Sequence, residues 1–229
     1  MPGNRTRRMV DTFFQTLEKI AGLVFPKECF LCSSKAKGYF CLECGNFAST
    51  SVLNQVGNRR NFYFDKIWVP FIYKDRLKEA IHMFKYKGNY FFARFFAAKI
   101  NEYLQVRKFD AKNFDCITAV PMPASRFRQR GYNQAGELAK ELSKVLDLPY
   151  KQILSCREGK TSQVGKSRLE RVNSLSGKFT ADTEYLEGVN IILVDDVVTT
   201  GATVSECAKV LKEKGAFRVD VVAIAKGEG

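Results

Sequence analysis

Apolar residues along the chain form two kinds of pattern, short unbroken runs and longer stretches with helical spacing. An unbroken run is typical of a strand covered on both faces, whereas apolar positions three and four apart indicate one buried face of a helix. The runs predict strands at residues 67–73, 116–120, 191–194 and 218–225. The spaced positions predict helices at residues 10–24, 76–86, 89–104 and 135–146, and one more after Thr203. Strands that alternate with helices predict an α/β fold.

Three local features refine this outline. Pro70 lies inside the first run and places that strand at a sheet edge, because proline cannot donate a ladder hydrogen bond. The helix at residues 10–24 is expected to pack on the rest of the protein, and the alternative is a helix that binds a partner or a membrane surface. Residues 48–61 are polar without clear periodicity, which predicts a linker.

Composition bounds the class of protein. The chain has 229 residues, of which 45% are hydrophobic, so it can bury a substantial core. Its net charge of +13 favours anionic partners such as nucleic acid, phosphorylated metabolites or an acidic protein. Residues 4–8 are basic like the start of a signal peptide, but Asp11 and Glu18 interrupt the apolar region that should follow. No apolar run approaches the roughly 18 residues of a membrane span, so we expect a cytoplasmic protein.

Four cysteines occur as two Cys-x-x-Cys pairs separated by eight residues: Cys29, Cys32, Cys41 and Cys44. Two such pairs can place four thiolates tetrahedrally around one zinc ion, and four protein ligands leave no open position for catalysis. Disulfides and redox thiols are the alternatives, and disulfides are disfavoured in a reducing compartment. The pattern therefore predicts a structural zinc site. The remaining cysteines, Cys116, Cys156 and Cys207, lack ligand spacing and are interpreted as packing thiols.

The most informative stretch follows the third predicted strand. Asp195 and Asp196 come directly after the apolar run, and Thr199-Thr-Gly-Ala-Thr203 then opens a helix. A helix N-terminus suits a phosphate, Gly201 allows close approach of a ligand, and adjacent carboxylates can accept hydrogen bonds from two sugar hydroxyls. A ribose 5-phosphate would satisfy both halves. The alternative is an ordinary strand–turn–helix with an Asp-rich turn and a threonine cap.

Basic residues cluster near other predicted element ends. The strand at residues 116–120 is followed by a predicted loop with Arg126, Arg128 and Arg130, and arginine binds phosphate through its planar fork. Ligands of open α/β sheets lie at the carboxyl ends of the strands, so this loop can face the same pocket as the acids. A basic surface loop is the alternative. Lys85 and Lys87 flank a helix end and could meet an anion, or could simply be solvated.

The stretch from Ile191 to Thr203 resembles the phosphoribosyl pyrophosphate (PRPP) loop of type I phosphoribosyltransferases. The resemblance implies that Asp195 and Asp196 hold the ribose hydroxyls and that the following loop wraps the 5-phosphate. The implied PRPP-binding residues are Asp195, Asp196, Val197, Thr199, Thr200, Gly201, Ala202 and Thr203. Magnesium would bridge PRPP oxygens, in keeping with its habit of binding phosphates with few protein ligands.

Taken together, the cysteine pairs, Tyr86-Lys-Gly88, Val120-Pro-Met-Pro123, Arg130-Gly-Tyr-Asn-Gln134, Arg171-x-Asn173 and the acidic loop resemble the ComF family. The resemblance implies an N-terminal helix (1–25), a zinc ribbon with its linker (26–60), and a type I phosphoribosyltransferase domain (61–229) with a mostly parallel sheet flanked by helices. Some family members are needed for DNA uptake in natural transformation.

The resemblance also implies roles for the basic residues. Pyrophosphate would be bound by Pro123, Ala124, Arg126, Arg128 and Lys85. The basic segment at residues 162–177 would include the flexible loop that closes over substrate, although a plain surface loop is as good an interpretation. No catalytic residue is identified from the sequence, and the candidates are Asp195, Asp196, Lys166 and Arg168.

Three functions remain open at this point. The first is a PRPP-binding protein that handles incoming single-stranded DNA, with nucleic-acid candidates Lys87, Arg94, Arg130 and Arg171 and a DNA-translocating helicase or ATPase as a possible partner. The second is a conventional phosphoribosyltransferase acting on a nucleobase or amine, which is weakened because residues 60–100 show no obvious base-recognition hood. The third is a non-enzymatic adaptor that binds a protein through the zinc ribbon.

Overall fold

The computed structural model describes residues 28–47, 49, 62–86, 90–157, 177–183 and 185–227. The chain divides into two compact units, residues 1–47 and residues 48–229. The helix predicted at residues 10–24 and most of the predicted linker lie outside the described residues. Within the described part of the chain, no helix is long and apolar enough to cross a membrane.

The first unit is built around the cysteine pairs. Its helix α2 (Leu42–Gly45) begins at Cys41, whose Sγ accepts a hydrogen bond from the backbone N–H of Cys44 at 3.5 Å. A turn at the first pair is closed by the backbone N–H of Cys29, which donates to the carbonyl of Ser34 at 2.7 Å. Backbone groups therefore shape both knuckles, and little apolar core is available to a unit this small.

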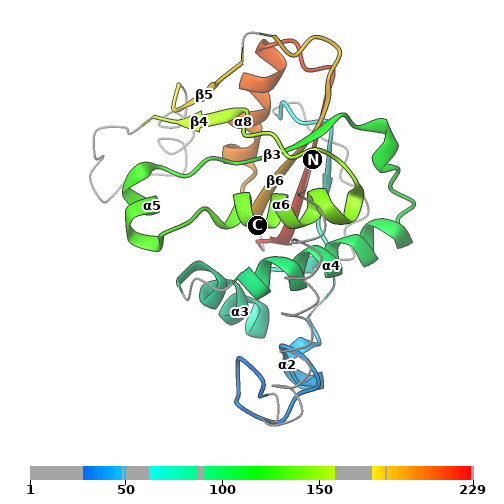
Figure 1. Ribbon diagram of the computed structural model, residues 1–229, viewed down its shortest axis with the longest axis vertical. Coiled ribbons are helices and arrows are strands. Elements are labelled where there is room, and N and C mark those ends of the chain that lie inside the picture. The colour runs from blue at the N-terminus through cyan, green and yellow to red at the C-terminus, as the bar shows by residue number, and fades with distance from the viewer. Residues whose placement is uncertain are drawn as a thin grey trace, which may run out of the picture. The chain divides into compact units, whose positions relative to one another are not determined.

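The second unit contains a parallel sheet with strand order β1-β7-β6-β3 (Figure 1). Its strands are β1 (Lys66–Trp68), β2 (Phe71–Ile72), β3 (Cys116–Ala119), β6 (Asn190–Val198) and β7 (Arg218–Lys226). Both β1 and β2 pair with β7, and Pro70 lies in the gap between them. The edge position predicted from Pro70 is confirmed, because among the described residues β1 pairs with no strand other than β7, and β2 has only a single-residue bridge from Ser49 to Phe71 besides its pairing with β7.

Helices cover both faces of this sheet. The helices of this unit are α3 (Asp75–Tyr86), α4 (Tyr90–Val106), α5 (Ala124–Arg130), α6 (Gln134–Leu146) and α8 (Ala202–Glu213), with a short 3-10 turn, η1 (Ala111–Asn113). Helix α8 packs its apolar stripe on one face of β6 and β7, and α6 packs on β3 and β6 and is itself covered by α4. The predicted α/β fold with a mostly parallel sheet is confirmed.

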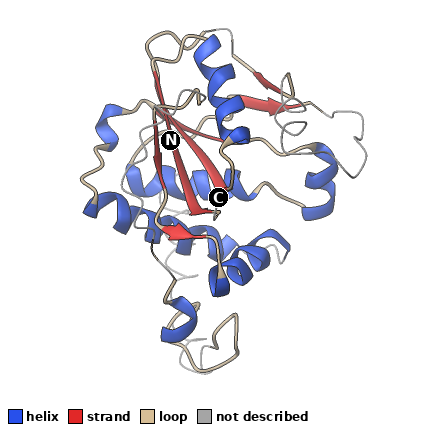
Figure 2. Ribbon diagram, turned by 180° about the vertical axis from the view of Figure 1, so that it is seen from behind, coloured by secondary structure: helices blue, strands red, loops and turns tan. Residues whose placement is uncertain are grey.

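A small antiparallel pair lies apart from the main sheet: β4 (Leu154–Cys156) pairs with β5 (Phe179–Ala181) (Figure 2). Neither strand is predicted by the sequence pattern, because each has only three residues and takes its burial from other elements. Residues 158–176, which contain most of the predicted basic loop, lie outside the described residues.

The predicted loop between residues 124 and 134 is wrong, since seven of its residues form α5. The backbone N–H of Phe127 donates to the carbonyl of Pro123 at 3.0 Å, which starts the helix. Gly131 has a φ of 79° and ends it, with its N–H bonded to the carbonyl of Phe127 at 2.8 Å. Alanine, arginine and glutamine are good helix formers, so the segment needed only these two boundaries to fold as a helix.

The sheet also buries a charged group at its amino-terminal end. Asp220 on β7 has no exposed side-chain surface, and it accepts hydrogen bonds from the indole of Trp68 at 2.8 Å and from the guanidinium of Arg218 at 2.9 and 2.8 Å. The bond from Trp68 ties the edge strand β1 to β7 near the amino-terminal end of β7, away from the strand carboxyl ends.

Replacing Asp220 by alanine should lower the free energy of unfolding by about 3–5 kcal/mol, because Trp68 and Arg218 then lose a buried partner. Urea unfolding followed by circular dichroism measures this change. The control is Glu79→Ala, which breaks an exposed ion pair with Arg76 and should cost less than about 0.5 kcal/mol. A cost below about 1 kcal/mol for Asp220→Ala would contradict a structural role for this carboxylate.

Candidate functional site

The strand ends create an open edge at the centre of the sheet. Pairing between β3 and β6 stops at Ala119 and Val194, while β6 continues beside β7 to Val198. The strand predicted to end at Val194 is therefore longer than expected, and Asp195 and Asp196 lie within it. Pro121 and Pro123 follow β3 without forming strand, so the last part of β6 is uncovered on that side.

A cavity of about 410 Å³ lies at this open edge. Its wall combines two carboxylates, two threonine hydroxyls and several cations. The lining residues with polar side chains are Tyr73, Lys85, Arg126, Arg130, Asn133, Gln134, Lys178, Asp195, Asp196, Thr199 and Thr203. The cavity thus brings together the acidic loop and the basic segment that the sequence predicts to share one pocket.

The two acids are held differently. Neighbouring residues of a strand point to opposite faces, so Asp195 is on the α8 side of the sheet and Asp196 is on the other. Asp196 forms an ion pair with Lys85 at 2.8 Å, and both side chains are mostly buried. Desolvation raises the pKa of Asp195 well above its usual range, and the negative charge of Asp196 raises this pKa further.

The loop after β6 prepares an anion site. Gly201 has a φ of 80° and precedes α8, and the hydroxyl of Thr200 accepts a hydrogen bond from the N–H of Ala202 at 3.3 Å. A Cβ at Gly201 would lie 3.1 Å from the ring of Phe62, so this turn requires glycine for both its conformation and its packing. Of the predicted PRPP-binding residues, Asp195, Asp196, Val197, Thr199 and Thr203 line the cavity, and Thr200, Gly201 and Ala202 build the turn.

Helix α5 divides the predicted basic residues between two cavities. Arg126 and Arg130, four residues apart, line the cavity with the acids. Arg128 and Ala124 instead line a second cavity of about 650 Å³ on the opposite face of α5. Of the predicted pyrophosphate-binding residues, the structure therefore brings Pro123, Arg126 and Lys85 to the acid pair, and does not bring Ala124 or Arg128 there.

The remaining basic candidates have different positions. Arg130, predicted as a nucleic-acid residue, lines the first cavity. Arg94 is exposed on α4 and does not line either cavity. Lys87, Lys166, Arg168 and Arg171 lie outside the described residues. Sequence reasoning missed Lys178, because its place at the cavity depends on the pairing of β4 with β5.

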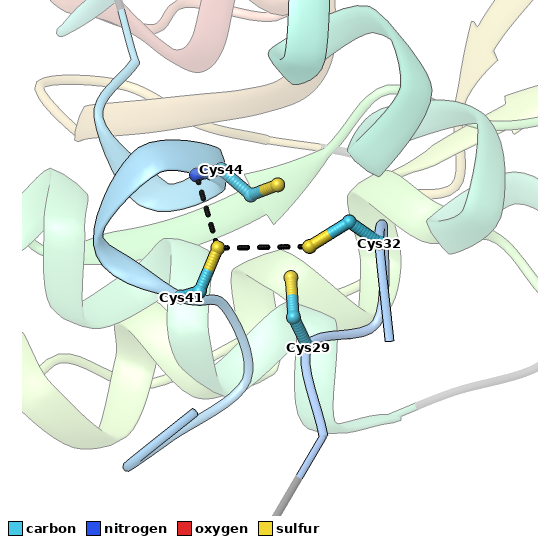
Figure 3. Close-up of side chains that lie close together, drawn as sticks. All are labelled: Cys29, Cys32, Cys41 and Cys44. Atoms are coloured by element: carbon cyan, nitrogen blue, oxygen red, sulfur yellow. Dashed lines mark hydrogen bonds between the residues drawn. The ribbon is translucent and has the colours of Figure 1, made fainter. Parts of the chain in front are cut away.

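The four cysteines of the first unit meet the geometric requirement for a metal site (Figure 3). Their Sγ atoms all lie within 4.8 Å of one another, and those of Cys32 and Cys41 are 3.7 Å apart. A tetrahedral zinc with Zn–S bonds of about 2.3 Å separates its sulfurs by about 3.8 Å. The observed spacing suits such an ion and is far longer than the roughly 2.05 Å of a disulfide bond. The residues present therefore fit a four-thiolate zinc site.

The thiols in this cluster differ in acidity. Hydrogen bonding with Ser34 lowers the pKa of the Cys32 thiol to about 6, and desolvation raises the pKa of Cys44 to about 12. Cys29 and Cys44 are buried, whereas Cys32 is exposed. Desolvation opposes ionisation of Cys44, and a divalent cation coordinated by all four sulfurs would offset that cost.

Comparison with known proteins agrees with this architecture. Residues 128–229 match the family model for the phosphoribosyl transferase domain. Together with the parallel sheet and the cavity at its carboxyl edge, this match makes the second unit a domain of the type I phosphoribosyltransferase fold.

Two relatives match most of the chain and identify its family. The chain is 32% identical to competence protein F of Haemophilus influenzae, with 86% of this chain and 84% of that protein covered. It is 30% identical to competence protein ComFC of Bacillus subtilis, with 82% and 79% covered. A shorter match, 35% identical over 49% of each chain, is to the DNA utilization protein YhgH of Escherichia coli O157:H7. The chain belongs to the ComF family.

Removing one thiol should abolish metal binding. We expect the purified protein to carry one zinc ion per chain, and Cys29→Ser or Cys44→Ser to lose it, because three thiolates bind zinc much more weakly than four. Elemental analysis after gel filtration measures the content. Cys156→Ser is the matched control, since Cys156 lies in the second unit and should leave zinc content unchanged. Full zinc content in Cys44→Ser would refute the four-cysteine site.

Asp195→Asn should stabilise the fold at neutral pH. A raised folded-state pKa contributes stability below the unfolded pKa of about 3.9, and that stability is lost as pH rises through the folded pKa. At pH 7 the Asp195 charge therefore opposes folding, and asparagine removes it while keeping an oxygen for the N–H of Asp196.

The melting temperature of Asp195→Asn should exceed that of the wild type at pH 7, and the difference should shrink as pH falls toward 4. Differential scanning calorimetry at several pH values measures it. Asp196→Asn is the control, because it loses the ion pair with Lys85 and should gain no stability. A lower melting temperature for Asp195→Asn at pH 7 would show that the charge is well accommodated.

Proposed function

We propose that the protein binds PRPP with magnesium in the first cavity and acts on incoming single-stranded DNA during DNA uptake. The observation that carries the proposal is the composition of that cavity. Asp195, Asp196 and the start of α8 contribute to its wall, and Lys85, Arg126, Arg130 and Lys178 supply positive charge to the same cavity. A sugar with phosphates at two positions has matching chemistry.

The ribose end of PRPP would lie against Asp195, Asp196 and the start of α8. Carboxylates accept hydrogen bonds from the 2′- and 3′-hydroxyls, and the two acids present oxygens within one cavity. The 5-phosphate would meet the hydroxyls of Thr199 and Thr203 and N–H groups in the first turn of α8, a helix of 12 residues. Gly201 maintains the turn that positions these groups, because its φ is 80° and a Cβ there would contact the ring of Phe62.

The pyrophosphate end would meet the cations. Arg126 and Arg130 project from the same face of α5, and an arginine fork can bind two phosphate oxygens at once. Magnesium would be held mainly by PRPP oxygens and would neutralise part of the pyrophosphate charge. In this proposal Lys85 interacts first with Asp196 and then with PRPP. It neutralises Asp196 before PRPP binds, and it can turn to a phosphate when sugar hydroxyls take over the carboxylate.

The DNA role rests on the relatives and on charge. Two matched proteins are named for competence and one for DNA utilization. The net charge of +13 favours a polyanion such as DNA. In this role a DNA-translocating helicase or ATPase would be the partner that handles the same strand. The four cysteines would hold one structural zinc ion, and reduced thiolates of this kind suit a cytoplasmic location.

Isothermal titration calorimetry with PRPP and magnesium should give saturable binding to one site per chain. The double variant Asp195→Asn, Asp196→Asn should bind at least about 100-fold more weakly, because both acceptors of the ribose hydroxyls are weakened and Lys85 loses its partner. Arg128→Ala is the matched control, since Arg128 faces the second cavity and should leave PRPP affinity unchanged.

Retained PRPP affinity in the double variant would show that Asp195 and Asp196 do not bind PRPP. A pyrophosphate-release assay on the same samples, with and without single-stranded DNA, then separates two modes of action. DNA-dependent release identifies a transferase that acts on nucleic acid, and binding without release identifies PRPP as a regulatory ligand.

A further inference from the structure

An exposed group of planar side chains lies beside the first cavity. Tyr86 is the last residue of α3, directly after Lys85, and its side chain is 49% exposed. The ring of His82, one helical turn earlier, is 4.6 Å from the Tyr86 ring with a tilt of 40°. The guanidinium of Arg130 lies over the same tyrosine, 5.2 Å from its ring centre. We call His82, Tyr86 and Arg130 the planar group.

Arg130 joins this group to the cavity. It lines the cavity, and one terminal nitrogen donates to Oε1 of Gln134 at 3.1 Å. Its Nε is buried and has no hydrogen-bond partner among the described residues. A buried donor without an acceptor is costly, so Arg130 would be stabilised by a ligand that offers an acceptor to its Nε.

The end of α3 is fixed in position by other contacts. The hydroxyl of Tyr132 donates to the carbonyl of Phe84, and Nε2 of Gln134 donates to the carbonyl of Lys85 at 3.2 Å. Both of these side chains are buried, with Tyr132 9% and Gln134 0% exposed. Tyr132 and Gln134 thus hold the end of α3 against the start of α6. Tyr86 is not needed to fix this helix end, and about half of its surface is exposed to solvent.

We propose that the planar group is a stacking site for a nucleobase of single-stranded DNA at the mouth of the first cavity. The inference rests on the proposed function and assigns the place where the strand is held. Bases stack on aromatic rings and on arginine planes without regard to sequence, which suits a protein that must accept any incoming strand. The net charge of +13 would attract the phosphates on either side of the stacked base.

The test compares two strands of equal charge. A dT12 oligonucleotide and an abasic 12-mer with the same phosphates are titrated by fluorescence anisotropy at fixed salt. Wild-type protein should bind dT12 more tightly, because only dT12 can stack. One stacked base is worth about 1–3 kcal/mol, which corresponds to about 5- to 150-fold in affinity.

Variants test whether the higher affinity for dT12 depends on Tyr86. Tyr86→Leu keeps an apolar side chain and should bring dT12 down to the affinity of the abasic strand, whereas Tyr86→Phe should stay within about twofold of the wild type. Tyr185→Leu is the matched control, because Tyr185 is 72% exposed and does not line either cavity. Melting temperatures check that each variant is folded. A strand carrying 5-iodouracil should photo-crosslink wild-type protein at Tyr86 or His82.

Several results would overturn the inference. They are equal affinity of the wild type for both strands, an unchanged preference for dT12 in Tyr86→Leu, or crosslinks only elsewhere in the chain. Tyr86-dependent binding of free thymidine monophosphate as tight as that of dT12 would assign the site to a free nucleotide instead of a strand. PRPP calorimetry on the same proteins keeps the two proposals apart, since wild-type protein that stacks dT12 but binds no PRPP contradicts only the PRPP site.

Discussion

Two carboxylates on consecutive residues of one strand place a concentrated negative charge at the carboxyl edge of the sheet, and the surrounding structure depends on how it is offset. Asp196 pairs with Lys85 at 2.8 Å, and Asp195 remains desolvated with a raised pKa. Structure that served stability alone would not retain a second acid there, because neutral side chains would satisfy the same backbone N–H groups. This cost to stability is the reason that our proposal assigns the acid pair to a ligand with several hydroxyl donors.

The ion pair also explains the placement of α3. Lys85 comes from the last turn of that helix, and buried side chains of Tyr132 and Gln134 bind the carbonyls at the same helix end. The carboxyl end of β6, the end of α3 and the start of α6 are thus linked around one cavity. A ligand that displaces Lys85 from Asp196 would act directly on this junction, and in our proposal PRPP would thereby influence what binds beside Tyr86.

Much of the site follows from local sequence. The acidic loop could be predicted because strand, carboxylates, glycine and helix start are contiguous, and the cysteine cluster because two Cys-x-x-Cys pairs bring four thiols together in a short segment. Other features depend on residues far apart in sequence. The continuation of β6 beyond Val194 requires β7 beside it, and Lys178 reaches the cavity only through the pairing of β4 and β5. The helical form of α5 also changes which arginines share a face, so Arg130 joins Arg126 while Arg128 points elsewhere.

The most direct measurement of the central claim is a crystal structure of the protein with PRPP and magnesium. Our account predicts the ribose hydroxyls on the carboxylates of Asp195 and Asp196, the 5-phosphate at the start of α8, and the pyrophosphate toward Arg126 and Arg130, with Lys85 released from Asp196. PRPP bound away from the acid pair, or bound with the ion pair between Lys85 and Asp196 intact, would contradict it.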